Sequence, residues 1–125
     1  MRIISFRRKN GSDAIGVMVD DTRLVDVSQR DATLPVKLRD VLAMPDGIDR
    51  LRKAAQGQQA DFSFDEVSLL PVIPESNAIW ALALNYKSHI EETGLTTSPD
   101  YPQIFLRTPA SQVGHLQPIV APPME

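Results

Sequence analysis

A histidine and a glutamate three positions apart, His89 and Glu92, are the residues best placed in this chain for acid–base chemistry. They follow an apolar run, residues 78–84, and stand in what should be the first turns of a helix. Residues three apart on a helix share a face, so the imidazole and the carboxylate can hydrogen-bond. A histidine oriented by a carboxylate is a recurring device for activating water. The pair therefore indicates general-base chemistry.

Other polar side chains near this pair admit more than one interpretation. Tyr86 either contacts a substrate or packs its ring against the protein, and Asn85 either caps the helix or touches a ligand. Arg107, which closes a short apolar strand, either pairs with a surface carboxylate or binds a carboxylate of the substrate. The His89–Glu92 pair also fits an exposed helix contact, which would contribute only about 0.2–0.5 kcal/mol. The residues alone leave both sets of roles open.

The totals exclude several classes of protein. Thirteen basic and sixteen acidic residues give a net charge of −3, which offers no general attraction to nucleic acid. The absence of cysteine excludes disulfides, thiol nucleophiles and thiolate metal sites. No apolar run approaches the ~20 residues of a membrane helix, and the N-terminus lacks the apolar segment of a secretory signal. We therefore expect no nucleic-acid or membrane partner, and a cytoplasmic location.

Three short apolar segments in the first third of the chain predict an antiparallel β-meander. They are residues 3–6, 14–19 and 23–27, with turn residues between them at Asn10–Gly11 and Asp20–Asp21. Three short strands cannot bury both faces of a sheet by themselves. We therefore expect helices to cover this meander.

The covering helices are predicted from the pattern of residues 38–57. Leu38 and Val41 have the i, i+3 spacing of a helix face. Asp46 stands at an N-cap position before a second helix that contains Leu51, and Gly57 is placed to end it. This region therefore predicts two short helices, followed by a short strand near residues 67–70.

A change in character near residues 71–76 predicts a domain boundary. Pro71 and Pro74 mark an extended linker. The run that follows, residues 78–84, is apolar without alternation, as expected for a strand buried on both faces, with Trp80 in the core. We therefore predict an α+β protein with a small N-terminal domain, residues 1–73, and the start of a second domain, residues 74–125.

The second domain is predicted to continue with one helix and one strand. Residues 85–93 form the helix, which Gly94 ends. A polar loop over residues 96–102 leads into residues 104–106, which we expect to be a short buried strand. The proline-rich tail, residues 109–123, predicts loop rather than helix, and His115 within it favours a structural turn over a binding role.

Taken in order, these segments resemble a known family. The order runs from the meander "RIISF…IGVMV…LVDVS" through "LLPVIP" and "IWALALNYKSHIEETG" to "PQIFLRTPASQVGHLQPIVAPP". The chain resembles the fumarylacetoacetate hydrolase family, in its bacterial branch that includes acylpyruvate hydrolases and homoprotocatechuate-pathway isomerases. The resemblance is weak over residues 1–60 and strong over residues 69–123. Its most specific piece is the motif NYxxHxxE, followed by an apolar strand and a VGH loop.

The resemblance implies a fold, a reaction and roles for named residues. The catalytic domain would be a mixed β-roll, of which residues 74–125 are the first part, and the protein would be a homodimer. Such enzymes use Mg²⁺ or Mn²⁺ to act on acylpyruvates or 2-oxo dicarboxylates of aromatic catabolism, as hydrolases, isomerases or decarboxylases. By the motif, His89 would be the general base that activates water and Glu92 its partner. Arg107 and Tyr86 would contact the substrate.

The chain departs from the family pattern in ways that affect these expectations. Ala83 stands where relatives usually have glycine, and Arg107 replaces a lysine, which exchanges a point donor for a planar fork. The carboxylates that hold the metal in the family are expected beyond residue 125, so we assign no metal ligand within the chain. We therefore do not expect residues 1–125 alone to catalyse the reaction. The alternative is a non-catalytic domain for assembly or ligand binding.

Overall fold

The computed structural model of the protein describes residues 1–94 and 101–123. Its contacts divide the chain into a first unit, residues 1–75 with 112–125, and a second unit, residues 76–111. Antiparallel strands and helices both occur, with three strands followed by three helices in the first part of the chain, which confirms the α+β class. The predicted division into domains 1–73 and 74–125 stays a prediction, as does the β-roll. Residues 96–100 of the predicted loop and Glu125 lie outside the described residues.

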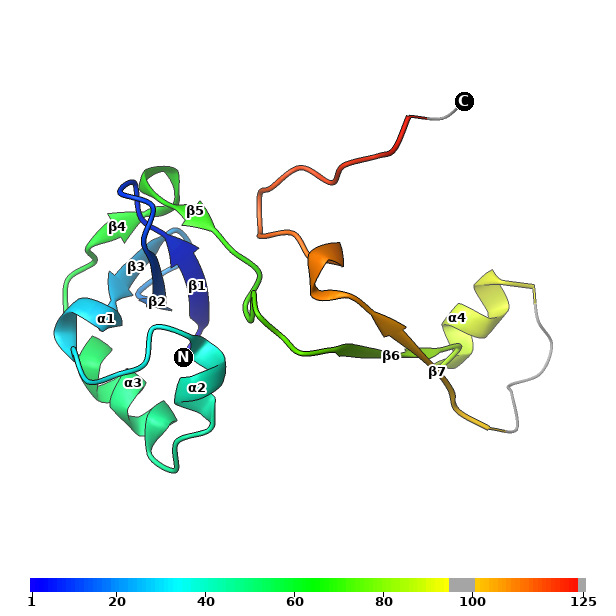
Figure 1. The fold of residues 1–125 in the computed structure, drawn as a ribbon, viewed down its shortest axis with the longest axis horizontal. Helices are drawn as coiled ribbons and strands as arrows, with labels where there is room; N and C mark the ends of the chain where they lie inside the picture. The colour runs from blue at the N-terminus through cyan, green and yellow to red at the C-terminus, as the bar shows by residue number, and fades with distance from the viewer. Residues whose placement is uncertain (95–100, 124–125) are drawn as a thin grey trace. The chain divides into compact units, whose positions relative to one another are not determined.

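A five-stranded antiparallel sheet forms the centre of the first unit, in the order β4-β3-β2-β1-β5 (Figure 1). Its strands are β1 (Ile3–Arg7), β2 (Asp13–Met18), β3 (Arg23–Asp26), β4 (Phe62–Ser63) and β5 (Ser68–Leu69). β1 to β3 confirm the predicted meander, and their register sets Phe6 opposite Ala14 and Val17 opposite Val25.

Three α-helices and a 3₁₀ turn complete the first unit. They are α1 (Val27–Arg30), α2 (Leu38–Leu42), α3 (Gly47–Ala55) and η1 (Phe64–Glu66). α2 and α3 were predicted, but α1 begins where the third strand was expected to end. The reason is local, because the Asp26 carboxylate accepts a hydrogen bond from the backbone N–H of Ser28 and so caps a helix at this point.

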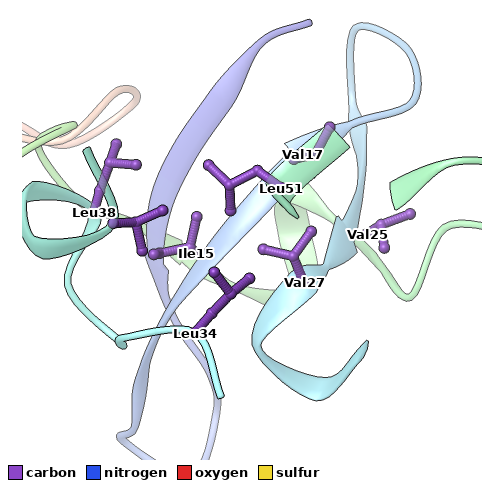
Figure 2. Close-up of a cluster of buried hydrophobic side chains, with 8 residues drawn as sticks. Ile15, Val17, Val25, Val27, Leu34, Leu38 and Leu51 are labelled. Atoms are coloured by element: carbon purple, nitrogen blue, oxygen red, sulfur yellow. The ribbon is translucent and has the colours of Figure 1, made fainter. Parts of the chain in front are cut away.

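Alternation along the strands gives the sheet two buried faces. One face packs against the helices, as predicted, and seven side chains of this cluster are labelled in Figure 2: Ile15, Val17, Val25, Val27, Leu34, Leu38 and Leu51. The opposite face buries a second cluster made of Phe6, Ala14, Leu24 and Leu69. The first unit therefore has an apolar core of its own on each side of the sheet.

The segment after the second unit returns to the first unit and packs against β5 and the residues that follow it. The Gln112 amide donates a hydrogen bond to the Ile73 carbonyl over 3.4 Å. Gly114 is buried so closely that a Cβ there would lie 1.9 Å from the Leu69 carbonyl oxygen. The His115 ring meets the Phe64 ring edge-on at 6.2 Å between centroids. His115 thus has a packing contact, in keeping with a structural turn.

The second unit contains an antiparallel pair of strands and one helix. Its elements are β6 (Ile79–Ala83), α4 (Lys87–Glu92), β7 (Gln103–Arg107) and the 3₁₀ turn η2 (Pro109–Ser111). α4 confirms the predicted helix, and Gly94 follows it with a φ of 74°. None of the helices in the described ranges is long and apolar enough to cross a membrane.

The predicted burial of the two strands in the second unit is wrong for the described residues. Trp80 is 70% exposed rather than part of a core, and every residue of β7 is exposed. The cause is that β6 and β7 form a sheet of two strands only. Their register places Trp80 opposite Leu106 and Leu82 opposite Ile104, on one face that no other described element buries.

Candidate functional site

The candidate site lies where β6 passes into α4. The strand ends at Ala83, Leu84 takes a left-handed backbone conformation with φ of 52°, and α4 begins at Lys87. Tyr86, not Asn85, is the N-cap residue, with an extended backbone and no capping hydrogen bond from its side chain. The cap that the sequence suggested for Asn85 is therefore not formed.

His89 and Glu92 meet on one face of α4, as their spacing predicted. The His89 Nδ1 and Glu92 Oε2 atoms are 3.6 Å apart, and the side chains are 43% and 76% exposed. This separation is slightly longer than a direct hydrogen bond. A carboxylate opposite Nδ1 favours a proton on that nitrogen, and Nε2 is then the atom that can accept one. Hydrogen bonds at sites without a bound substrate are often this long, so the separation is compatible with a paired histidine and carboxylate.

Tyr86 lies beside this pair. Its ring centroid is 5.8 Å from that of His89, with the two planes tilted by 44°, and its side chain is largely exposed. Tyr86 and Glu92 thus each lie beside His89, the first through its ring and the second through its carboxylate. The structure thus brings three of the four sequence-predicted site residues together.

Arg107 is the fourth predicted site residue, and it lies elsewhere in the second unit. The strand register sets Arg107 opposite Ile79, whereas α4 follows Ala83, which is opposite Gln103. Four residues of a strand span about 13 Å, so the backbone of Arg107 is at the other end of the strand pair from the turn into α4. Its contact with a substrate stays a prediction.

Leu84 is the residue of this region that the sequence did not single out. Leucine rarely adopts a positive φ, because its Cβ then crowds the following carbonyl. Asn85, its neighbour, is the type that more often does so. No signal in the residue type could therefore have marked position 84 as the turning point.

The described residues do not fit the Mg²⁺ or Mn²⁺ ion expected from the family. Within residues 1–94 and 101–123, no group of three or more histidine, cysteine, aspartate or glutamate side chains could hold a metal ion. A hard divalent cation takes about six oxygen ligands in fixed geometry.

The first unit contains a cleft away from the candidate site residues. It encloses about 300 Å³ and is lined by apolar residues, including Val36, Leu70 and Ile73. Polar groups at its edge are already engaged, since Lys37 pairs with Glu75 and the Ser5 hydroxyl donates to a backbone carbonyl over 2.7 Å. The cleft therefore offers a ligand chiefly apolar surface, unlike the polar face of α4.

Comparison with known proteins finds a distant relative of this chain. The chain is 29% identical, over 125 residues, to the oxaloacetate tautomerase fahd2, mitochondrial, of Xenopus laevis. No family model matches the chain. The match covers 98% of this chain but 39% of the relative, so the chain spans about two-fifths of the length of that protein. The similarity supports the fumarylacetoacetate hydrolase superfamily and does not distinguish among its branches.

Proposed function

We propose that this chain supplies the proton-transfer residues of a fumarylacetoacetate hydrolase superfamily enzyme. The substrates would be 2-oxo dicarboxylates or acylpyruvates, and the enzyme would be homodimeric. The observation that carries this proposal is the His89–Glu92 pair, 3.6 Å apart on the open face of α4. It is supported by the similarity to an oxaloacetate tautomerase, because oxaloacetate is itself a 2-oxo dicarboxylate.

In the proposed mechanism His89 is the base. In hydrolysis, Nε2 takes a proton from water, the resulting hydroxide attacks a carbonyl carbon, the adjacent C–C bond breaks, and the imidazolium returns the proton to the departing carbon. In tautomerisation, Nε2 takes a proton from the carbon next to a carbonyl, and the imidazolium returns it to the oxygen of the resulting enolate, which gives the enol. Glu92, opposite Nδ1, holds the ring and stabilises the imidazolium that forms. Hydrolysis and tautomerisation thus share a first step at the same atom. The exposed Tyr86 ring, beside His89, would contact the substrate, and Arg107 would bind one of its carboxylates.

The test uses the protein expressed from its complete coding sequence. Keto–enol interconversion of oxaloacetate is followed by the ultraviolet absorbance of the enol, and acylpyruvate hydrolysis by product formation. His89→Ala should lower kcat by at least about 100-fold, because a general base contributes roughly 10²–10⁴-fold. Glu92→Gln should lower kcat on the order of 10-fold, because the ring loses its orienting charge.

Glu91→Gln is the matched control, since Glu91 is an exposed carboxylate on the same helix but on a different face. It should leave kcat unchanged. Unaltered turnover in His89→Ala would overturn the assignment of the base. Equal losses in Glu91→Gln and Glu92→Gln would instead indicate a general charge effect on substrate binding.

A second candidate function is assembly, favoured by the open apolar face of β6 and β7. Trp80, Leu82, Ile104 and Leu106 are each at least 50% exposed. Contiguous exposed apolar surface is typical of interaction sites. Under this alternative the protein would self-associate without metal, Trp80→Glu would abolish association in sedimentation experiments, and neither substrate would turn over. Turnover that depends on His89 would exclude it as the sole function.

A further inference from the structure

The backbone of Leu84 is the most unusual feature of the second unit. In the described part of the chain, two residues other than glycine have a positive φ, namely Leu84 at 52° and Leu116 at 65°. A side chain with a Cβ is strained in this region, and glycine would adopt it without strain. Such strain persists only where the surrounding structure holds it, and it is often associated with functional sites.

The two leucines differ in what their side chains do. Leu116 is 73% exposed, so its side chain gains little from packing. Leu84 is half-buried. At position 84 the left-handed backbone is therefore combined with a residue that is partly removed from solvent. Glycine would supply the backbone conformation but has no side chain to bury.

The position of Leu84 gives it control over the direction of α4. Ladder pairing holds β6 as far as Ala83, which is opposite Gln103. Only residues 84–86 separate that fixed strand from the first residue of the helix. A change at Leu84 to the ordinary φ near −60° would redirect everything that follows, including the face that carries His89 and Glu92.

We propose that Leu84 is the positioning residue of the candidate site, and this inference rests on the proposed function. Its left-handed backbone turns the chain from β6 into α4, and its half-buried side chain fixes the angle of that turn. Together they hold Tyr86, His89 and Glu92 in the arrangement that proton transfer requires. Small misplacements of a catalytic group can lower a rate by about 100-fold, so the effect of disturbing Leu84 should be large.

The experiment compares substitutions that separate the backbone from the side chain, in the protein expressed from its complete coding sequence. Isoleucine has the same atoms as leucine but is branched at Cβ, so Leu84→Ile disfavours a positive φ. Leu84→Gly keeps the left-handed backbone and removes the half-buried side chain. Leu84→Met is unbranched at Cβ, so it keeps both the left-handed backbone and an apolar side chain of similar size. We expect kcat to fall about 10- to 100-fold in Leu84→Ile, to fall less in Leu84→Gly, and to stay near the parent value in Leu84→Met.

Leu116→Ile is the matched control, because it places the same β-branched strain at the other left-handed leucine. It should lower the melting temperature to a similar extent as Leu84→Ile while leaving kcat and its pH profile unchanged. A purely structural role for Leu84 would make the two variants alike in every property. Equal kcat values for Leu84→Ile and Leu116→Ile would therefore overturn the inference.

A readout without substrate keeps this test separate from the proposed function. The Tyr86 and His89 ring centroids are 5.8 Å apart, so NMR should detect a nuclear Overhauser contact between the rings and a ring-current shift of the imidazole. Loss of both in Leu84→Ile and Leu84→Gly, but not in Leu116→Ile, supports the inference even if neither substrate turns over. Unchanged imidazole signals in Leu84→Gly overturn it, and that variant carries the test if Leu84→Ile does not fold.

Discussion

The two units of this chain differ in how they use apolar residues. In the described part of the chain, every buried apolar side chain belongs to the first unit except Ile90 of α4. The first unit closes its core on both faces of a sheet. The second unit leaves Trp80, Leu82, Ile104 and Leu106 largely exposed.

This difference separates stability from chemistry. The residues that suit proton transfer, His89 and Glu92, are on the open helix of the weakly packed unit. Functional groups commonly lie on accessible segments, and such segments have fewer buried contacts to hold them. We therefore expect substitutions in the first unit to act on folding and substitutions around α4 to act on turnover.

The largest expected effect breaks the core of the first unit. Leu51→Ala removes a side chain with 0% exposure from the cluster shown in Figure 2. Such a truncation lowers the free energy of unfolding by about 2–5 kcal/mol. Leu82→Ala, at a side chain that is 50% exposed, should change it by no more than about 0.5 kcal/mol. Denaturant unfolding with residue-resolved amide exchange measures both variants.

Amide exchange also shows which unit responds. Leu51→Ala should speed exchange in β1 to β3 and leave α4 unaffected. If Leu82→Ala destabilised the protein as much as Leu51→Ala, the β6–β7 face would be buried in the intact protein. The difference in apolar burial between the two units would then hold within the described residues but not in the intact protein.

Substitutions at two glycines, one in each unit, should show the same difference between the units through smaller changes in stability. A Cβ at Gly47 would lie 1.9 Å from the Val41 carbonyl oxygen, whereas a Cβ at Gly94 would meet nothing within 4 Å. Gly47→Ala should therefore lower the free energy of unfolding by about 1–3 kcal/mol through overpacking. Gly94→Ala should cost about 1 kcal/mol, through its φ of 74° alone.

Asparagine at the same positions separates the two causes. Asn adopts positive φ more readily than alanine, so Gly94→Asn should be better tolerated than Gly94→Ala. At Gly47 a larger side chain can only worsen the clash, so Gly47→Asn should be less stable than Gly47→Ala. Melting temperatures that ranked alanine and asparagine in the same order at both positions would contradict this distinction.

Most of the first unit could be predicted because its signals are local. Short apolar segments separated by turn residues predict β1 to β3, and the helical spacing of Leu38 and Val41 predicts α2. α1 was missed because Asp26 is both the last residue of the third strand and the N-cap of the helix, so the apolar pattern continues across the boundary. The cap itself is local, but the fully buried Asp26 carboxylate also accepts a hydrogen bond from Arg8, a distant residue that no short window of sequence contains.

The candidate site was predictable in part. The spacing of His89 and Glu92 was enough to place them on one helix face. The apolar pattern of residues 78–84 predicts burial but not the partner that would provide it, and Trp80 is exposed for that reason. The left-handed backbone of Leu84 could not be predicted, because leucine rarely adopts a positive φ.

The smallest expected effect concerns the ionic contacts of the first unit. Asp31, which follows α1, accepts hydrogen bonds from the Thr33 hydroxyl over 2.6 Å and from Arg50 of α3, also over 2.6 Å. The Thr33 hydroxyl, and then Arg50, lower the pKa of Asp31 from 3.8 to about 2. A carboxyl with a lowered pKa stabilises the folded state only while it is ionised.

The sign of the pH dependence follows from this shift. Well above its ordinary pKa of 3.8 the Asp31 carboxyl is ionised in both states and its contribution is complete, whereas between about pH 5 and pH 2 the unfolded chain takes up the proton first. Stability should therefore fall over that interval, and Asp31→Asn should flatten part of the fall. Asp20, whose pKa is also about 2, should account for a further part.

Thr33→Val should raise the pKa of Asp31 more than Arg50→Met does, as read from the carboxyl carbon by NMR, because the hydroxyl is the larger cause. A larger rise of the Asp31 pKa in Arg50→Met than in Thr33→Val would mean that the charge of Arg50, rather than the hydrogen bond from Thr33, is the main stabilising contact of the carboxylate at the end of α1.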